Sequence, residues 1–157
     1  GYNSANGWPI GKILEKDFPE VEAVLYARGG FLMVNQGDKL VREKSFFVSP
    51  EFFQLFSFPL LKGNPEKALT EPYSVLISED MEKKYFPGGD ALNKTLVMAD
   101  TLHVMVSGVM KNIPSNSHIQ GDMFFSFNTF TSLEQSFSFE DGWGNINMIN
   151  YVLLKEG

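Results

Sequence analysis

The sequence predicts a mixed α+β fold, in which largely antiparallel sheets carry a few short helices. Short segments of alternating apolar and polar residues recur along the chain with tight turns between them, and helix starts marked by capping side chains interrupt the series. The sequence contains no internal repeat, low-complexity tract or evident linker. With 157 residues, the chain has room for one ordinary domain or for two small interleaved subdomains.

The amino-terminal part predicts a helix followed by a strand. A helix is expected over residues 9–17, ended near Pro19, because apolar residues recur there at helical spacing. The recurring residues are Ile10, Ile13, Leu14 and Phe18. A strand is then expected over residues 21–28.

Two glycines, Gly29-Gly30, are expected to break this strand, after which an extended pattern resumes over residues 31–35. Gln36-Gly37-Asp38 has the composition of a tight turn. It predicts a hairpin whose second strand covers residues 40–48.

Two helix starts follow, at Ser49-Pro50-Glu51 and Asn64-Pro65-Glu66. Each combines a capping side chain, a proline suited to the first turn and a carboxylate near the positive end of the helix dipole. After the first start, three rings fall on one face of a helix that Pro59 ends, and we expect them to be core anchors. They are Phe52, Phe53 and Phe56.

A strand–helix unit is predicted next. The apolar run at residues 74–78 is typical of a strand covered on both faces. Ser78 caps a helix that continues through Tyr85 and stops at Pro87-Gly88-Gly89.

The rest of the chain predicts further strands. The tight turn Ala99-Asp100-Thr101 joins strands over residues 96–99 and 102–110. In the second of these, Leu102, Val104 and Val106 face one way, and His103, Met105 and Ser107 face the other. The remaining elements are a strand at 123–130, a short helix and loop at 131–144 and a strand at 147–154.

Composition excludes several functions. A net charge of −6 without a basic cluster argues against nucleic-acid binding. Cysteine is absent, which removes disulfides and thiolate chemistry, and no apolar run reaches the roughly 20 residues of a membrane span. The 15 phenylalanines indicate a ring-packed core, with a docking surface as the alternative.

No constellation for catalysis, cofactor binding or metal binding is present. His103 and His118 lack neighbouring ligands at metal-binding spacing, and no serine lies in a nucleophile elbow. The glycines around Gly88 and Gly142 match no phosphate-binding loop. We therefore expect no catalytic, cofactor or metal residues.

Two short patterns concern modification. Asn93-Lys94-Thr95 satisfies the N-glycosylation sequon, and Asp100-Thr101-Leu102 is similar to a three-residue O-glycosylation motif of some periplasmic proteins. Both are expected in exposed turns, and glycosylation at Asn93 or Thr101 is left open.

Five ordered segments resemble the MacB-like periplasmic core domain of ABC-transporter permeases, a family related to FtsX-type permeases. The resemblance covers residues 18–157. Its motifs stand at residues 48–63 (VSPEFFQLFSFPLLKG), 75–87 (beginning VLISE and ending KYFP), 92–96 (LNKTL), 106–114 (VSGVMKNIP) and 116–119 (NSHI). The chain departs from the pattern at Asn93, where glycine is usual, and at Met81-Glu82, where the helix usually carries a small residue.

This resemblance implies a non-enzymatic, extracytoplasmic domain inserted between two membrane helices of a permease, on the periplasmic side of the bacterial inner membrane. Gly1 in place of an initiator methionine predicts a fragment or a processed product. The resemblance implies a slight truncation, because relatives continue past the last strand into a further helix. Implied partners are its own transmembrane helices, a second permease subunit, a cytoplasmic ATP-binding subunit or domain, and a periplasmic adaptor. The expected role is to couple cytoplasmic ATP hydrolysis to the export or extraction of a substrate by conformational transmission. A stand-alone extracytoplasmic ligand-binding or sensor domain is the alternative.

Overall fold

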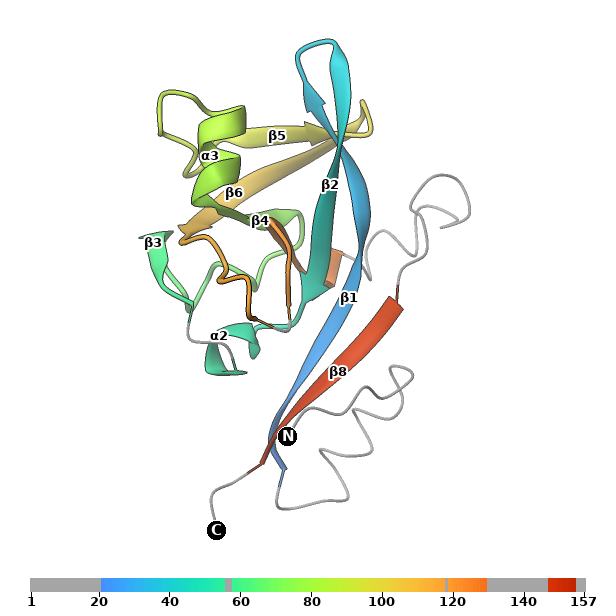
Figure 1. Cartoon of the computed structure of the whole chain (residues 1–157), viewed down its shortest axis with the longest axis vertical. Helices are drawn as coiled ribbons and strands as arrows, with labels where there is room; N and C mark the ends of the chain where they lie inside the picture. Colours follow the sequence, from blue (N-terminus) through green and yellow to red (C-terminus); the bar gives the residue numbers. More distant parts are fainter. Residues whose placement is uncertain (1–20, 56–57, 118, 130–146, 155–157) are drawn as a thin grey trace.

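The computed structural model describes residues 21–55, 58–117, 119–129 and 147–154 of the chain. Strands dominate this part, and the helices are few and short (Figure 1). The strands are β1 (Val21–Gln36), β2 (Lys39–Val48), β3 (Leu60–Gly63), β4 (Ser74–Ser78), β5 (Thr95–Met98), β6 (Leu102–Met110), β7 (Met123–Ser126) and β8 (Asn147–Leu154). The helices are α2 (Phe52–Leu55) and α3 (Glu79–Tyr85).

The eight strands form one mixed sheet, most of which closes on itself. Six strands follow the order β2-β7-β4-β6-β5-β1, and β1 also pairs with β2, so that they make a small barrel. The β2–β7 and β4–β6 pairs are parallel, whereas β1 pairs antiparallel with β2, β5 and β8. The predicted mixed, largely antiparallel pairing is confirmed.

The barrel interior is the main hydrophobic core. Each of the six barrel strands contributes apolar side chains to it, and Met81 of α3 adds to the same cluster. The strand residues in this cluster are Leu32, Val34, Phe47, Val75, Ile77, Leu96, Met98, Val104, Val106, Val109, Met123 and Phe125. A packed interior of this kind holds the strands in register without leaving a pore.

A second core lies outside the barrel wall, against α2. Its centre is formed by three rings: Phe46 stacks on Phe124 at a centroid distance of 5.7 Å, and Phe52 lies 4.9 Å from Phe124. Successive residues of a strand point to opposite faces, so neighbouring rings of β2 and β7 serve different cores. The predicted ring-packed core is confirmed.

Strand β1 is continuous through Gly29-Gly30, and the predicted break there is wrong. A Cβ on Gly29 would lie 2.6 Å from Cε1 of Phe46. Glycine is therefore used here for close approach to a buried ring, and the ladder with Phe46 opposite Gly29 keeps the strand extended.

The helix predicted after Asn64-Pro65-Glu66 is also wrong, because residues 65–70 form turns. Asn64 does cap the first turn, with its side chain accepting from the Glu66 N–H at 3.0 Å. The turn cannot grow, since Pro72 disfavours helical geometry at the preceding residue and Ser74 must enter β4. Strand β3, just before it, was not predicted.

The strand–helix unit matches its prediction. All five residues of β4 are buried, and the Ser78 side chain accepts a hydrogen bond from the Met81 N–H, which caps α3. Strand β7 is shorter than predicted, because residues 127–129 are helical. The final strand is confirmed as β8, whereas the predictions for residues 9–17, 131–144 and Phe56 fall outside the described residues.

Replacement of Phe124 by alanine tests the second core. Phe124 is fully buried between the rings of Phe46 and Phe52, so Phe124→Ala should lower the free energy of unfolding by about 3–5 kcal/mol. Denaturant unfolding measures this loss. The matched control is Phe31→Ala at a side chain that is 43% exposed, which should cost less than about 1 kcal/mol. Equal losses in the two variants would contradict the assignment.

Candidate functional site

The barrel has one weak seam, between β1 and β5. The two strands share a single residue pair, Val34 with Met98, next to a hydrogen bond from the Ala99 N–H to the Met33 carbonyl at 2.9 Å. Beyond this pair the strands separate beside an open groove of about 420 Å³. The groove is lined by Asn35, Gln36, Gly37, Tyr85, Phe86, Thr95, Leu96 and Val97.

Side-chain hydrogen bonds brace the β1–β2 hairpin across this seam. The side-chain amide of Asn35 donates to the Asp100 carboxylate at 2.7 Å, and its Oδ1 accepts from the Asp100 main-chain N–H at 3.0 Å. Gln36 donates to the Lys84 main-chain carbonyl at 3.0 Å. These contacts tie the end of β1 to the β5–β6 turn and to the end of α3.

A buried carboxylate completes the brace. Glu43 of β2 is 7% exposed, and it accepts hydrogen bonds from the Tyr85 hydroxyl at 2.7 Å and from Lys84 Nζ. Burial raises the pKa of the Tyr85 phenol well above its usual value, and the hydrogen bond to Glu43 and its negative charge raise it further. Tyr85 therefore stays protonated and remains a donor to Glu43.

A second buried carboxylate joins β3 to α3. Glu82 is 8% exposed, and Lys62 of β3 donates to both of its carboxylate oxygens, at 3.1 and 2.9 Å. Lys62 also donates to the Gly89 carbonyl, and the Ala91 N–H donates to Glu82 at 3.3 Å. The contacts of Lys62 and Glu82 therefore join α3, β3 and the loop that follows α3.

Two glycines make the pairing of β3 with β6 possible. Gly63 lies opposite Gly108, and a Cβ on Gly63 would lie 2.5 Å from the Ser107 carbonyl oxygen. Gly63 also has a φ of +97°, which favours glycine. These two glycines come from two of the sequence motifs, residues 48–63 and 106–114, so the motifs meet in the fold.

Three serine hydroxyls donate to main-chain carbonyl or carboxylate oxygens of neighbouring segments. Ser74 donates to the Glu71 carbonyl at 2.6 Å, and Ser107, at a bulge in β6, donates to the Ala68 carbonyl at 2.6 Å. Ser78 caps α3 and donates to the Asp122 carboxylate at 3.3 Å. Each of these hydroxyls has a structural partner.

The structure describes one of the two histidines. His103 lies on the exposed face of β6, as predicted, and His118 lies outside the described residues. Among the residues that the structure describes, no cluster of three metal-binding side chains occurs, and no helix has the length and apolarity needed to cross a membrane.

The two modification patterns lie in exposed turns. Asn93 is exposed and has a φ of 66°. Thr101 is exposed at the β5–β6 turn, where Ala99 and Asp100 both have positive φ and Asn35 holds Asp100 in place. Glycosylation at either residue stays a prediction.

Comparison with known proteins gives one consistent result. The family model described as the MacB-like periplasmic core domain matches residues 2–157. A crystallised domain of a Porphyromonas gingivalis protein assigned as a permease is similar at 27% identity, with a TM-score of 0.73. The match covers 99% of this chain and 64% of that domain, so the chain spans less than two thirds of this relative. No curated protein matches the sequence.

Two more distant structures share the fold. The periplasmic region of MacB from Actinobacillus actinomycetemcomitans is 14% identical with a TM-score of 0.70, over 99% of this chain and 68% of that one. The extracellular domain of the noncanonic ABC-type transporter YknZ from Gram-positive bacteria is 15% identical with a TM-score of 0.67, over 98% and 74%.

The pair of Lys62 and Glu82 gives a test of the buried carboxylates. Lys62→Ala removes the cation bound to Glu82, whose side chain taken alone is 11% exposed. The free energy of unfolding should therefore fall by about 1–3 kcal/mol. The double variant Lys62→Ala/Glu82→Ala should recover most of this loss, because it removes the unpaired charge. Urea unfolding measures both variants.

The control for this test is Lys94→Ala, which removes an exposed pair with Asp90 whose nitrogen and oxygen lie 3.6 Å apart. It should change the free energy of unfolding by less than about 0.5 kcal/mol. A double variant no more stable than Lys62→Ala would show that Glu82 is not the source of the loss.

Proposed function

The chain belongs to the MacB-like periplasmic core domain family, and we propose that it couples ATP hydrolysis on the cytoplasmic side of a permease to substrate export by transmitting conformational change. Family membership makes it the periplasmic domain of an ABC-transporter permease. The proposed role needs no catalytic residue. It needs a stiff connection between the membrane side and the opposite end of the domain.

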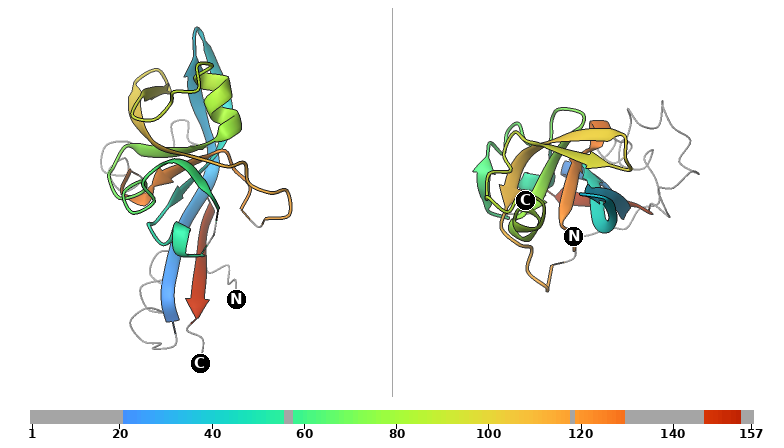
Figure 2. Two further views of the ribbon diagram at one scale, coloured as in Figure 1. Left: turned by 90° about the vertical axis from the view of Figure 1, so that its left-hand side faces the viewer. Right: turned by 90° about the horizontal axis from the view of Figure 1, so that it is seen from above.

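Strand β1 is the observation that carries this proposal. Its 16 residues extend over about 50 Å at the rise of an extended strand. The first half pairs with β8, and the second half pairs with β2 and forms part of the barrel. Figure 2 shows the hairpin projecting at one end and β1 and β8 leaving the barrel together at the other.

The base of the domain supports the same role. The β1–β8 ladder brings Val21 opposite Leu154, so the described chain enters and leaves the base side by side. Two consecutive membrane helices attached at such a base would move β1 and β8 as one paired unit. The brace made by Asn35, Glu43 and their partners would then carry that movement into the barrel.

Several finer points belong to the same proposal. The chain is a fragment of a larger permease, with two interleaved subdomains: the barrel with its helices, and a second unit built on the β1–β8 ladder. The working protein contains a second permease subunit and an ATP-binding subunit or domain, and it works with a periplasmic adaptor. The domain itself is non-catalytic.

A stand-alone ligand-binding or sensor domain is the second candidate. The observation that favours it is the groove of about 420 Å³ between Asn35, Tyr85 and Thr95, which has both polar and apolar walls. Micromolar binding of a small molecule, abolished by a substitution in this groove, would favour it over transmission.

The test uses the full permease with its ATP-binding partner, and a spin label on Asp38 at the exposed hairpin turn of both subunits. The distance between the labels should change between ATP-bound and nucleotide-free states. In Val24→Pro/Leu25→Pro this change should shrink while ATP hydrolysis persists. Because neighbouring N–H groups point to opposite edges of a strand, one of the two residues directs its N–H toward β8. Proline has no N–H, so replacing both residues removes a hydrogen bond between β1 and β8.

The matched control is Val24→Ala/Leu25→Ala, which keeps both N–H groups and should preserve the distance change. Melting temperature checks that the barrel, whose β1 ladder with β2 begins at Ala27, is still folded in both variants. A distance that does not respond to nucleotide would refute transmission. A full response in the proline variant would refute β1 as its carrier.

A further inference from the structure

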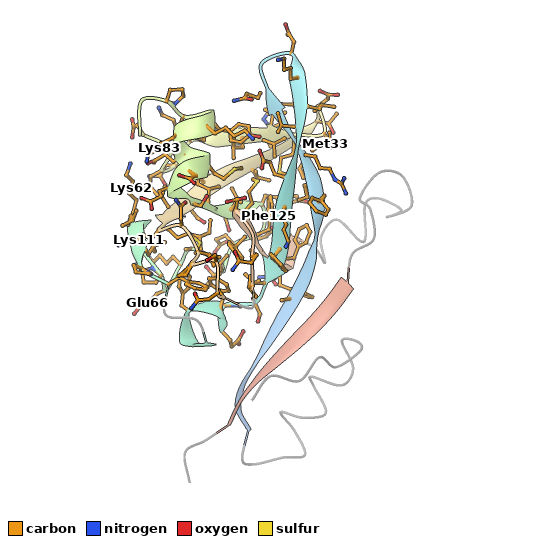
Figure 3. The ribbon with its side chains drawn as sticks, viewed as in Figure 1. Met33, Lys62, Glu66, Lys83, Lys111 and Phe125 are labelled. Carbon is orange, nitrogen blue, oxygen red and sulfur yellow. The ribbon has the colours of Figure 1, made fainter. Side chains whose placement is uncertain are left out.

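The outward side of the β1–β2 hairpin combines exposed apolar and basic side chains. Leu32 and Val34 point into the barrel, so the alternate residues of β1, Phe31 and Met33, point outward, and so do the residues paired with them on β2. We define the hairpin outer face by five residues on this side: Phe31, Met33, Leu40, Arg42 and Lys44. Phe31 and Leu40 are each 43% exposed, and Figure 3 labels Met33 on this hairpin.

The charges of this face differ from those of the chain as a whole. The chain has a net charge of −6, yet the face holds two cations and no carboxylate. Among the described residues, neither Arg42 nor Lys44 makes an ion pair, since the pairs formed there use Lys62, Lys84 and Lys94. The carboxylate of β2, Glu43, points the other way and is bound by Tyr85 and Lys84.

Arg42 is already held in position. Its guanidinium carbon lies 3.9 Å from the centroid of the Phe31 ring, which is a cation–π contact across the two strands. The planar guanidinium is thus oriented with its N–H groups available at the edge of an aromatic surface. Such an arrangement binds carboxylates well, because the side chain loses little further conformational entropy on binding.

We propose that the hairpin outer face docks an acidic segment of a partner protein that also carries apolar side chains. Its carboxylates would meet Arg42 and Lys44, and its apolar side chains would cover Phe31, Met33 and Leu40. This deepens the proposed function, because it adds a contact at the end of the domain to which β1 would carry movement.

Two other occupants fit this face less well. A second copy docked through the same face would set Arg42 and Lys44 against their own equivalents, which is repulsive in a two-fold contact. An anionic membrane would suit the charges, but β1 carries this face about 30–45 Å away from the base where the proposed function puts the membrane.

The experiment titrates the chain into fluorescently labelled synthetic peptides and follows anisotropy. The acidic peptide alternates glutamate with leucine, the basic one lysine with leucine and the neutral one serine with leucine. The acidic peptide should bind, and raising the salt to about 0.5 M should weaken it. Arg42→Glu/Lys44→Glu should weaken binding at least about tenfold, and Phe31→Ala should weaken it without changing the charge.

The matched control is Lys83→Glu/Lys111→Glu, which also reverses two exposed cations. Figure 3 shows both of these lysines on the other side of the ribbon from Met33. This variant should bind the acidic peptide within about twofold of the unaltered chain. Circular dichroism confirms that each variant is folded before binding is compared.

Three results would overturn the proposal: no binding of the acidic peptide, equal losses in the two charge-reversal variants, or equal binding of the basic or neutral peptide. Vesicles containing anionic lipid test the membrane as the occupant. If the chain binds them and Arg42→Glu/Lys44→Glu abolishes that binding, the face is assigned to a membrane and the proposal fails. Sedimentation tests self-association, and a dimer lost in that variant would assign the face to a second copy. None of these readouts depends on nucleotide, so docking and transmission can fail separately.

Discussion

The pairing of β1 on both of its edges is the constraint on which this structure depends. One edge is hydrogen-bonded to β2, and the other to β8 and, at Val34, to β5. The same strand therefore closes the barrel, carries the hairpin and holds the last strand of the chain. Because Gly29 lies against the ring of Phe46, this strand stays extended at the point where its partners change.

Buried carboxylates then position the helix against the strands. Glu43 of β2 binds Lys84 and Tyr85 of α3. Glu82 of α3 binds Lys62 of β3 and the Ala91 N–H. A buried carboxylate without such partners would be costly, so each one specifies the arrangement of its neighbours. Lys62 supplies the charge that compensates Glu82.

Much of the local structure could be predicted from local signals. The apolar run of β4, the Ser78 cap and the Ala99-Asp100 turn depend on residues close in sequence, and all three are confirmed. Gly29-Gly30 was misread because a glycine used for close approach looks like a strand breaker until its partner ring is known. The helix start at Asn64 failed because Pro72 and the entry into β4 left the turn no room to grow.

The sequence by itself determined the family, the ring-packed core and the type of most elements, since periodicity, caps and ordered motifs are local properties of the chain. Only the tertiary structure decided the closure of the barrel, the meeting of Gly63 with Gly108 and the brace at Asn35 and Glu43. It also decided that Phe31, unlike the buried phenylalanines, lies exposed beneath Arg42. The physical reason is that pairing partners and the sides of a closed sheet are set by contacts between residues far apart in the sequence.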